Sequence, residues 1–211
     1  MTEYARRVIA TIGARDTPAH ILEIMEEVGY SLAKMGRMIH SGGAVGADKA
    51  FQIGVERFCR ENGISPCERQ RIFLPENYFK GLKHDEKRGI YSFPRSTRYS
   101  EAVSMAKRVY LNPKAARNWP EWMSNLMGRN CLQALSEDLS TPVSAIICWT
   151  KDGSIDGSKK SSGGTGQALR LAKKFNIPVF NLANEHQLEF VKKHIIEKAK
   201  NIDQELLLHN N

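Results

Sequence analysis

The chain has 211 residues, of which 41% are hydrophobic and 26% are charged, and its formal net charge at pH 7 is +8. The length suits one domain, and the composition is ordinary for a soluble globular protein. No apolar run approaches the roughly 20 residues of a transmembrane helix, which argues against a membrane protein. The basic excess favours polyanionic partners, such as nucleic acid or the phosphates of nucleotides.

The N-terminus and the cysteines indicate a cytoplasmic protein. The first residues lead directly into a strand-like segment, without the long apolar stretch of a signal peptide. The four cysteines form no C-x-x-C pair, and we expect them to be reduced and structural. Because no His or Cys pairs stand at ligand spacing, we expect no metal site, and the sequence predicts no cofactor.

Apolar periodicity in the first part of the chain predicts strands that alternate with helices. In chain order, the predicted elements are a strand at 7–12, a helix at about 19–35, a strand at 38–40, a helix at about 47–61 and a strand at 71–74. Periodicity then vanishes between about residues 76 and 100, where the chain is polar, basic and aromatic. We expect this segment to be a long functional loop, because it lacks the apolar pattern of a separate domain.

The alternation resumes after this segment. The predicted elements are a short helix through 105, a strand at 108–111, a helix at about 120–137, a strand at 145–149, a helix at 167–175, a strand at 179–182 and a helix from about 188 to 206. This order predicts an α/β, Rossmann-like, mostly parallel sheet with helices on both faces, as one domain over residues 1–211. Ligands of such sheets bind outside the carboxyl ends of the strands, where this sequence places its glycines.

The first candidate binding segment follows the first predicted strand. Gly13 permits a turn that frees backbone N–H groups, and Arg15 is a planar donor suited to phosphate. A tight turn with a solvated arginine is the alternative. The second candidate segment, 41–48, joins a strand to a helix, and Ser41, Gly42, Gly43, Gly46 and Asp48 are its candidate ligand-binding residues. The glycines would let backbone approach a phosphate at the helix start.

The role of Asp48 stays open, because an aspartate at this place caps a helix or reaches a ribose hydroxyl. The segment lacks the Lys-Ser/Thr pair of a P-loop, which argues against Walker-type ATP hydrolysis. A third candidate segment precedes a predicted helix, and its residues are Gly163, Gly164, Thr165 and Gly166. Thr165 would donate to a phosphate or cap the helix.

Two further groups of residues have a functional and a structural interpretation. Arg129 and Asn130 interrupt an otherwise apolar helix, where they would hold a ligand at the rim of the sheet or pair with Glu137 or Asp138. Trp119, Trp122 and Trp149 could stack on bases, but we expect them to pack in the core.

These motifs together resemble the SLOG superfamily, which includes the DNA-processing protein A family and the LOG-type phosphoribohydrolases. The resemblance rests on Gly13-Ala14-Arg15, the 41–48 segment, Gly128-Arg129-Asn130 and residues 163–166, and it is strongest to short, phage-type members of the DNA-processing family. It implies a Rossmann-like domain that binds single-stranded DNA as a dimer. Where the LOG pattern has its catalytic glutamate, this chain has Leu169 and Arg170.

The leading hypothesis is therefore a protein that binds a nucleotide or single-stranded DNA and forms a homodimer or higher homo-oligomer. Basic and aromatic residues of the 76–100 segment would extend the binding track. The alternatives are an enzyme that cleaves the N-glycosidic bond of a nucleoside monophosphate, with Asp48 or Glu76 as the catalytic carboxylate, and a sensor or sponge for a nucleotide signal.

Overall fold

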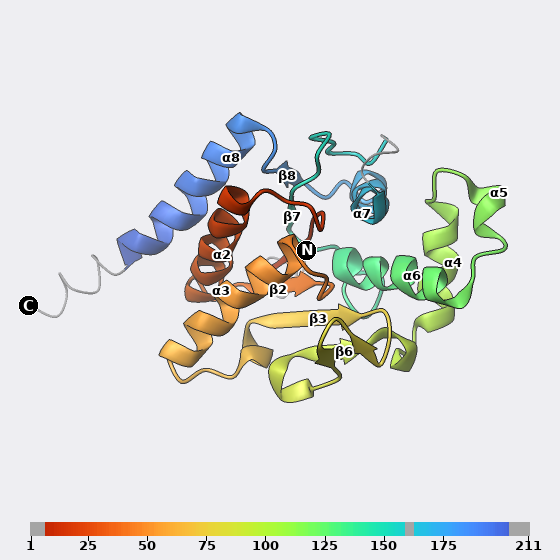
Figure 1. Ribbon diagram of the computed structural model, residues 1–211, viewed down its shortest axis with the longest axis horizontal. Helices are drawn as coiled ribbons and strands as arrows, with labels where there is room; N and C mark the ends of the chain where they lie inside the picture. The colour runs from red at the N-terminus through yellow and green to blue at the C-terminus, as the bar shows by residue number, and fades with distance from the viewer. Residues whose placement is uncertain (1–6, 159–162, 203–211) are drawn as a thin grey trace, which may run out of the picture.

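Six parallel strands form the central sheet of the computed structural model, which describes residues 7–158 and 163–202 (Figure 1). The spatial order is β6-β3-β2-β1-β7-β8, and every neighbouring pair is parallel. The strands are β1 (Val8–Thr11), β2 (Met38–Ser41), β3 (Gln70–Leu74), β6 (Ile90–Ser92), β7 (Ala145–Cys148) and β8 (Val179–Asn181). The α/β, Rossmann-like fold expected from the sequence is confirmed.

Helices cover both faces of this sheet. On one face lie α2 (Ala19–Lys34), α3 (Ala47–Glu61) and α8 (Glu185–Val191), and the last of these continues as a π-helical segment (Lys192–Glu197). On the other face lie α4 (Tyr99–Arg108), α6 (Glu121–Leu135) and α7 (Gly163–Lys174), and a short α5 (Pro113–Ala116) follows α4. Alternate residues of each strand point to opposite faces, so that Val8 and Ala10 join one apolar cluster and Ile9 joins the other.

The order of the strands reverses beside β1. The chain passes from β1 outward through β2, β3 and β6, and then crosses to β7 and β8 on the other side. A reversal of this kind opens a crevice at the carboxyl ends of the strands, because the connections on its two sides run in opposite directions. The segments after β1 and β2 and the first turn of α7 meet at this crevice.

The predicted strand at 108–111 is wrong. Arg108 ends α4, and residues 109–111 lie in turns. Within this stretch the ring of Tyr110 packs without a strand, edge-on to Trp119 with 4.8 Å between ring centres, whereas Leu111 is exposed. The carbonyl oxygen of Val109 accepts a hydrogen bond from Arg170 Nε at 2.8 Å. A short apolar run does not by itself distinguish a strand from such a packed turn.

The segment at 76–100, predicted as one long loop, contains regular secondary structure over much of its length, which corrects that expectation. It contains an antiparallel hairpin of β4 (Tyr78–Phe79) and β5 (Leu82–Lys83), short 3₁₀ turns and the edge strand β6. Leu82 and Ile90 are buried beside Ile72 and Leu74 in a small apolar cluster. Strand β6 has three residues between Gly89 and Phe93-Pro94, which is too short to produce a visible alternation in the sequence.

Some helix limits differ from the expected ones, and one lies outside the described residues. Helix α7 begins at Gly163, so residues 163–166 form its first turn and not a loop before it. The predicted last helix reaches 206, but the positions after 202 lie outside the described residues. None of the helices within residues 7–158 and 163–202 is long and apolar enough to cross a membrane.

Candidate functional site

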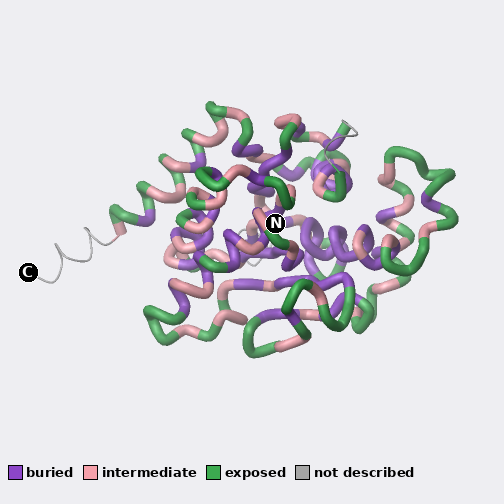
Figure 2. Tube along the Cα trace, viewed as in Figure 1, coloured by how far each residue is buried: buried purple, intermediate pink, exposed green. Residues whose placement is uncertain are grey.

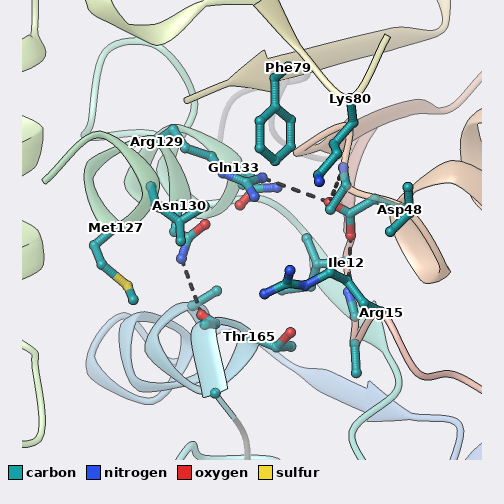
Figure 3. Close-up of a pocket in the computed structure, with 18 of the residues that line it drawn as sticks. Ile12, Arg15, Asp48, Phe79, Lys80, Met127, Arg129, Asn130, Gln133 and Thr165 are labelled. Atoms are coloured by element: carbon teal, nitrogen blue, oxygen red, sulfur yellow. Dashed lines mark hydrogen bonds and ion pairs between the residues drawn. The ribbon is translucent and has the colours of Figure 1, made fainter. Parts of the chain in front are cut away.

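A cavity of about 660 Å³ opens at the carboxyl end of the sheet (Figure 3). Its walls come from the segments after β1 and β2, the tip of the β4–β5 hairpin, one side of α6 and the first turn of α7. The lining residues are Ile12, Gly13, Ala14, Arg15, Asp16, Ala44, Val45, Asp48, Phe79, Lys80, Trp122, Leu126, Met127, Arg129, Asn130, Gln133, Gly163, Gly164, Thr165 and Ala168. Elements distant in the sequence therefore share one site.

Asp48 joins the first two candidate segments. Its Oδ1 accepts a hydrogen bond from the N–H of Gly13 at 3.2 Å, and its Oδ2 accepts one from the N–H of Ala44 at 3.3 Å. Burial raises the pKa of Asp48, while Arg129 and the neighbouring backbone N–H groups oppose that rise. Both carboxylate oxygens face donors, which is the environment of an ionised group. Asp48 thus holds the segment after β1 against the start of α3.

Helix α6 carries buried polar side chains into this site and is buried along most of its length (Figure 2). Arg129 Nη1 lies 3.8 Å from Asp48 Oδ2, and burial lowers the pKa of Arg129, which Asp48 opposes. In the amide orientation that satisfies both of its groups, Gln133 Oε1 accepts from Arg129 Nη1 and from the N–H of Gly42, each at 2.8 Å. Arg129 pairs with Asp48, and the alternative partners Glu137 and Asp138 are wrong.

Asn130 connects α6 to the start of α7. Its Nδ2 donates to the carbonyl oxygen of Gly164 at 3.2 Å and to Gln167 Oε1 at 2.8 Å. In the same orientation as above, Gln133 Nε2 donates to Asn130 Oδ1 at 2.8 Å. The consecutive residues Arg129 and Asn130 therefore hold two different walls of the cavity, one at α3 and one at α7.

The glycines of the 41–48 segment serve close packing, and they are not among the residues that line the cavity. Gly42 lies against the guanidinium of Arg129, where a side chain would collide with it. Gly43 has a φ of +67°, and a Cβ there would lie 2.8 Å from Leu74 Cδ2. Gly46 has a φ of +82° and lies against the backbone of Arg15. The expectation that these three glycines contact a ligand is therefore not supported by their positions.

The glycines at the start of α7 lie differently. A Cβ at Gly163 or Gly164 would meet nothing within 4 Å, and both residues line the cavity with Thr165. Two other candidates do not line it, because Ser41 and Gly166 are buried behind it. Gly13 does line the cavity and donates its N–H to Asp48. Of the candidate glycines, Gly163 and Gly164 leave the most open space beside their backbone.

Two exposed cations reach the cavity from separate loops. Arg15 enters from the segment after β1, and Lys80 enters from the tip of the hairpin (Figure 3). Neither has a salt-bridge partner among the residues that the structure describes. Apolar side chains complete the lining, and among them Trp122 is 57% exposed. The expected core role is wrong for Trp122, whereas Trp149 is buried and Trp119 is partly buried in the core.

The two candidate catalytic carboxylates have different positions. Glu76 is exposed and is not among the cavity-lining residues. Within the described ranges, the carboxylates that line the cavity are Asp48, which is engaged as above, and the exposed Asp16. The same ranges contain no group of three or more His, Cys, Asp or Glu side chains placed to hold a metal ion.

The sequence did not single out Gln133. Its side-chain amide forms hydrogen bonds with Arg129, Asn130 and the N–H of Gly42. One signal for it was present, because Gln133 stands one helical turn after Arg129 on the same face of a predicted helix. No local signal identified Lys80 within the basic segment, since several lysines and arginines surround it. Its place in the cavity follows from the hairpin alone.

No family model matches this chain, and no curated protein matches it. Among solved structures, DNA processing protein A from Helicobacter pylori, described with a single-stranded DNA binding mode, is similar at a TM-score of 0.36 and 16% sequence identity. The match covers 90% of this chain and 80% of that one. At this level the likeness identifies neither the site residues nor a shared ligand.

Proposed function

We propose that the cavity binds the phosphate groups of a nucleotide or of single-stranded DNA. The observation that carries the proposal is the convergence of Arg15 and Lys80, from two separate loops, on the space beside the first turns of α3 and α7. The first turn of a helix presents N–H groups and a positive dipole, and a guanidinium or an ammonium adds charge. A phosphate is the common biological ligand with this requirement.

The remaining lining suits a nucleoside. Phe79 and Trp122 present ring surfaces at the cavity, and Leu126 and Met127 add apolar surface from α6. Aromatic rings stack on bases with little regard to base identity. The volume, about 660 Å³, lies within the range of small-molecule sites. These features support a ligand that joins an apolar ring to an anion.

The lining favours binding over N-glycosidic cleavage. Cleavage needs a carboxylate that reaches the sugar, where positive charge develops. Asp48 is 3% exposed and engaged with two N–H groups and Arg129, and Glu76 lies outside the lining. A sensor or sponge for a nucleotide signal would use the same cavity and differs from a DNA-binding protein in the length of its ligand.

The test measures the affinity of the protein for mononucleotides and for oligothymidylates of increasing length, at several salt concentrations. We expect the affinity for oligomers to rise with length and to fall steeply with salt. Arg15→Ala should reduce the salt slope by about 0.7 for each lost phosphate contact. Arg60→Ala is the matched control, because Arg60 is exposed at the far end of α3.

Two further measurements separate the alternatives. Saturation by a mononucleotide, with no gain from longer oligomers, would favour a sensor or sponge. Release of free base from a panel of nucleoside monophosphates, followed by chromatography, would favour the enzyme and contradict the proposal. A native mass spectrum of freshly purified protein tests the homodimer that we also propose, and it shows any co-purified nucleotide.

A further inference from the structure

The turn of the β4–β5 hairpin places a lysine in an unfavourable backbone conformation. The register Phe79↔Leu82 leaves a two-residue turn of Lys80 and Gly81, and their φ angles are +51° and +84°. Positive φ at both positions is the pattern of a type I′ turn, whose first position favours Asn, Asp or Gly. A lysine there is strained, because its Cβ crowds the backbone in the left-handed region.

The base of the hairpin is fixed to the wall of the cavity. Leu82 is buried in the small apolar cluster with Ile72, Leu74 and Ile90. A Cβ at Gly43 would lie 3.0 Å from Leu82 Cδ1, so the hairpin packs closely on the segment that follows β2. This packing sets the position of the turn relative to the cavity. The turn itself is open, since a Cβ at Gly81 would meet nothing within 4 Å.

Among the residues that the structure describes, none holds the side chain of Lys80 by a hydrogen bond or an ion pair that would offset the strain. Lys80 is exposed, and its side chain is directed at the cavity, where it lies near the start of α3 (Figure 3). Strained backbone that lacks a structural partner is typical of functional positions.

We propose that Lys80 binds a phosphate group of the ligand, and that its left-handed backbone is retained because this conformation directs the ammonium into the cavity. The inference rests on the proposed function and adds to it the backbone conformation that places the ammonium of Lys80. Arg15 and Lys80 then contact the anion from two separate segments, and the hairpin determines where the second contact lies.

The test compares three variants with the wild type. Lys80→Asn removes the charge and relieves the strain, and Lys80→Gln removes the charge while the strain remains. Lys83→Asn removes an equal charge from β5 of the same hairpin, at an exposed position that does not line the cavity. Thermal unfolding reports the strain, and the affinity for a fluorescent oligothymidylate reports the contact with phosphate.

We expect Lys80→Asn to raise the melting temperature by about 2–4 °C and to weaken binding about tenfold. Lys80→Gln should weaken binding equally without raising the melting temperature, and Lys83→Asn should change neither quantity. Unchanged affinity in both Lys80 variants, with binding lost in Arg15→Ala, would overturn this inference and leave the phosphate site standing. A melting temperature that does not rise in Lys80→Asn would contradict the inferred backbone strain at residue 80. If the wild type binds neither oligomers nor nucleotides, both proposals fail.

Discussion

Arg129 Nη1 lies 3.8 Å from Asp48 Oδ2, and both side chains are almost completely buried. This ion pair joins α6 to the start of α3. Asp48→Asn should lower the free energy of unfolding by about 3–5 kcal/mol, because it leaves a buried guanidinium without a counter-ion. The new amide would also present its own N–H groups to the backbone N–H of Gly13 or Ala44. Urea denaturation measures the loss.

The control for this prediction is Asp16→Asn, which removes a carboxylate that lines the same cavity but is exposed. We expect it to change the free energy of unfolding by less than about 0.5 kcal/mol. Equal stabilities of Asp48→Asn and wild type would show that the buried pair does not hold α6 to α3.

Two glycine substitutions separate packing from binding. Gly43→Ala should lower stability by about 1–3 kcal/mol, because φ is +67° and the new Cβ would lie 2.8 Å from Leu74 Cδ2. Gly164→Ala should raise stability by up to about 1 kcal/mol, because it replaces a helical glycine that faces open space. The added methyl group should nevertheless weaken oligothymidylate binding, since Gly164 lines the cavity. Unweakened binding by Gly164→Ala would place the phosphate away from α7.

Substitutions of two tryptophans should have different effects, one on ligand binding and the other on stability. Trp122 is 57% exposed at the cavity, so Trp122→Ala should weaken binding by about 1–3 kcal/mol and leave the melting temperature nearly unchanged. Trp119 packs edge-on against Tyr110 beside the core, so Trp119→Ala should lower the melting temperature. Fluorescence anisotropy and thermal unfolding, applied to both variants, distinguish the two roles. Full affinity in Trp122→Ala would exclude stacking at this residue.

The buried imidazole of His40 should make the free energy of unfolding fall in acid. Burial, and then the charge of Arg71, lower the pKa of His40 from 6.5 to about 3. Between these values the unfolded chain binds a proton that the folded protein does not, so stability falls as the pH drops below 6.5 and this loss ends near pH 3. At pH 5 the loss from this residue should be about 2 kcal/mol relative to pH 7.

Urea denaturation at pH 7, 6 and 5 measures this slope. His40→Leu should flatten it, because the unfolded chain then has one fewer group to protonate. His20→Leu, at an exposed position on α2, is the control and should keep the slope of the wild type. A profile of His40→Leu as steep as that of the wild type would contradict this assignment.

Local periodicity in the sequence was sufficient to predict most of the fold. The pattern of β-branched strands and amphipathic helices predicted five of the six strands of the sheet and the helices between them. It failed at β6, where three residues are too few to alternate, and at 108–111, where the chain leaves α4 in a turn and bends. A strand that adds to a sheet edge is stabilised by its neighbour β3, which local sequence does not report.

The sequence by itself also predicted that Arg15, Asp48 and Thr165 would meet, because strands of a parallel sheet carry their following segments to one edge. It left open whether Arg129 and Asn130, within a helix, would join them. The tertiary structure alone decided what each one contacts. Asp48 and Arg129 pair across elements far apart in the chain, and Gly42 makes room for that guanidinium. Lys80 reaches the cavity because Leu82 anchors its hairpin beside Gly43. Such contacts depend on packing between distant segments, and no periodicity within one segment encodes them.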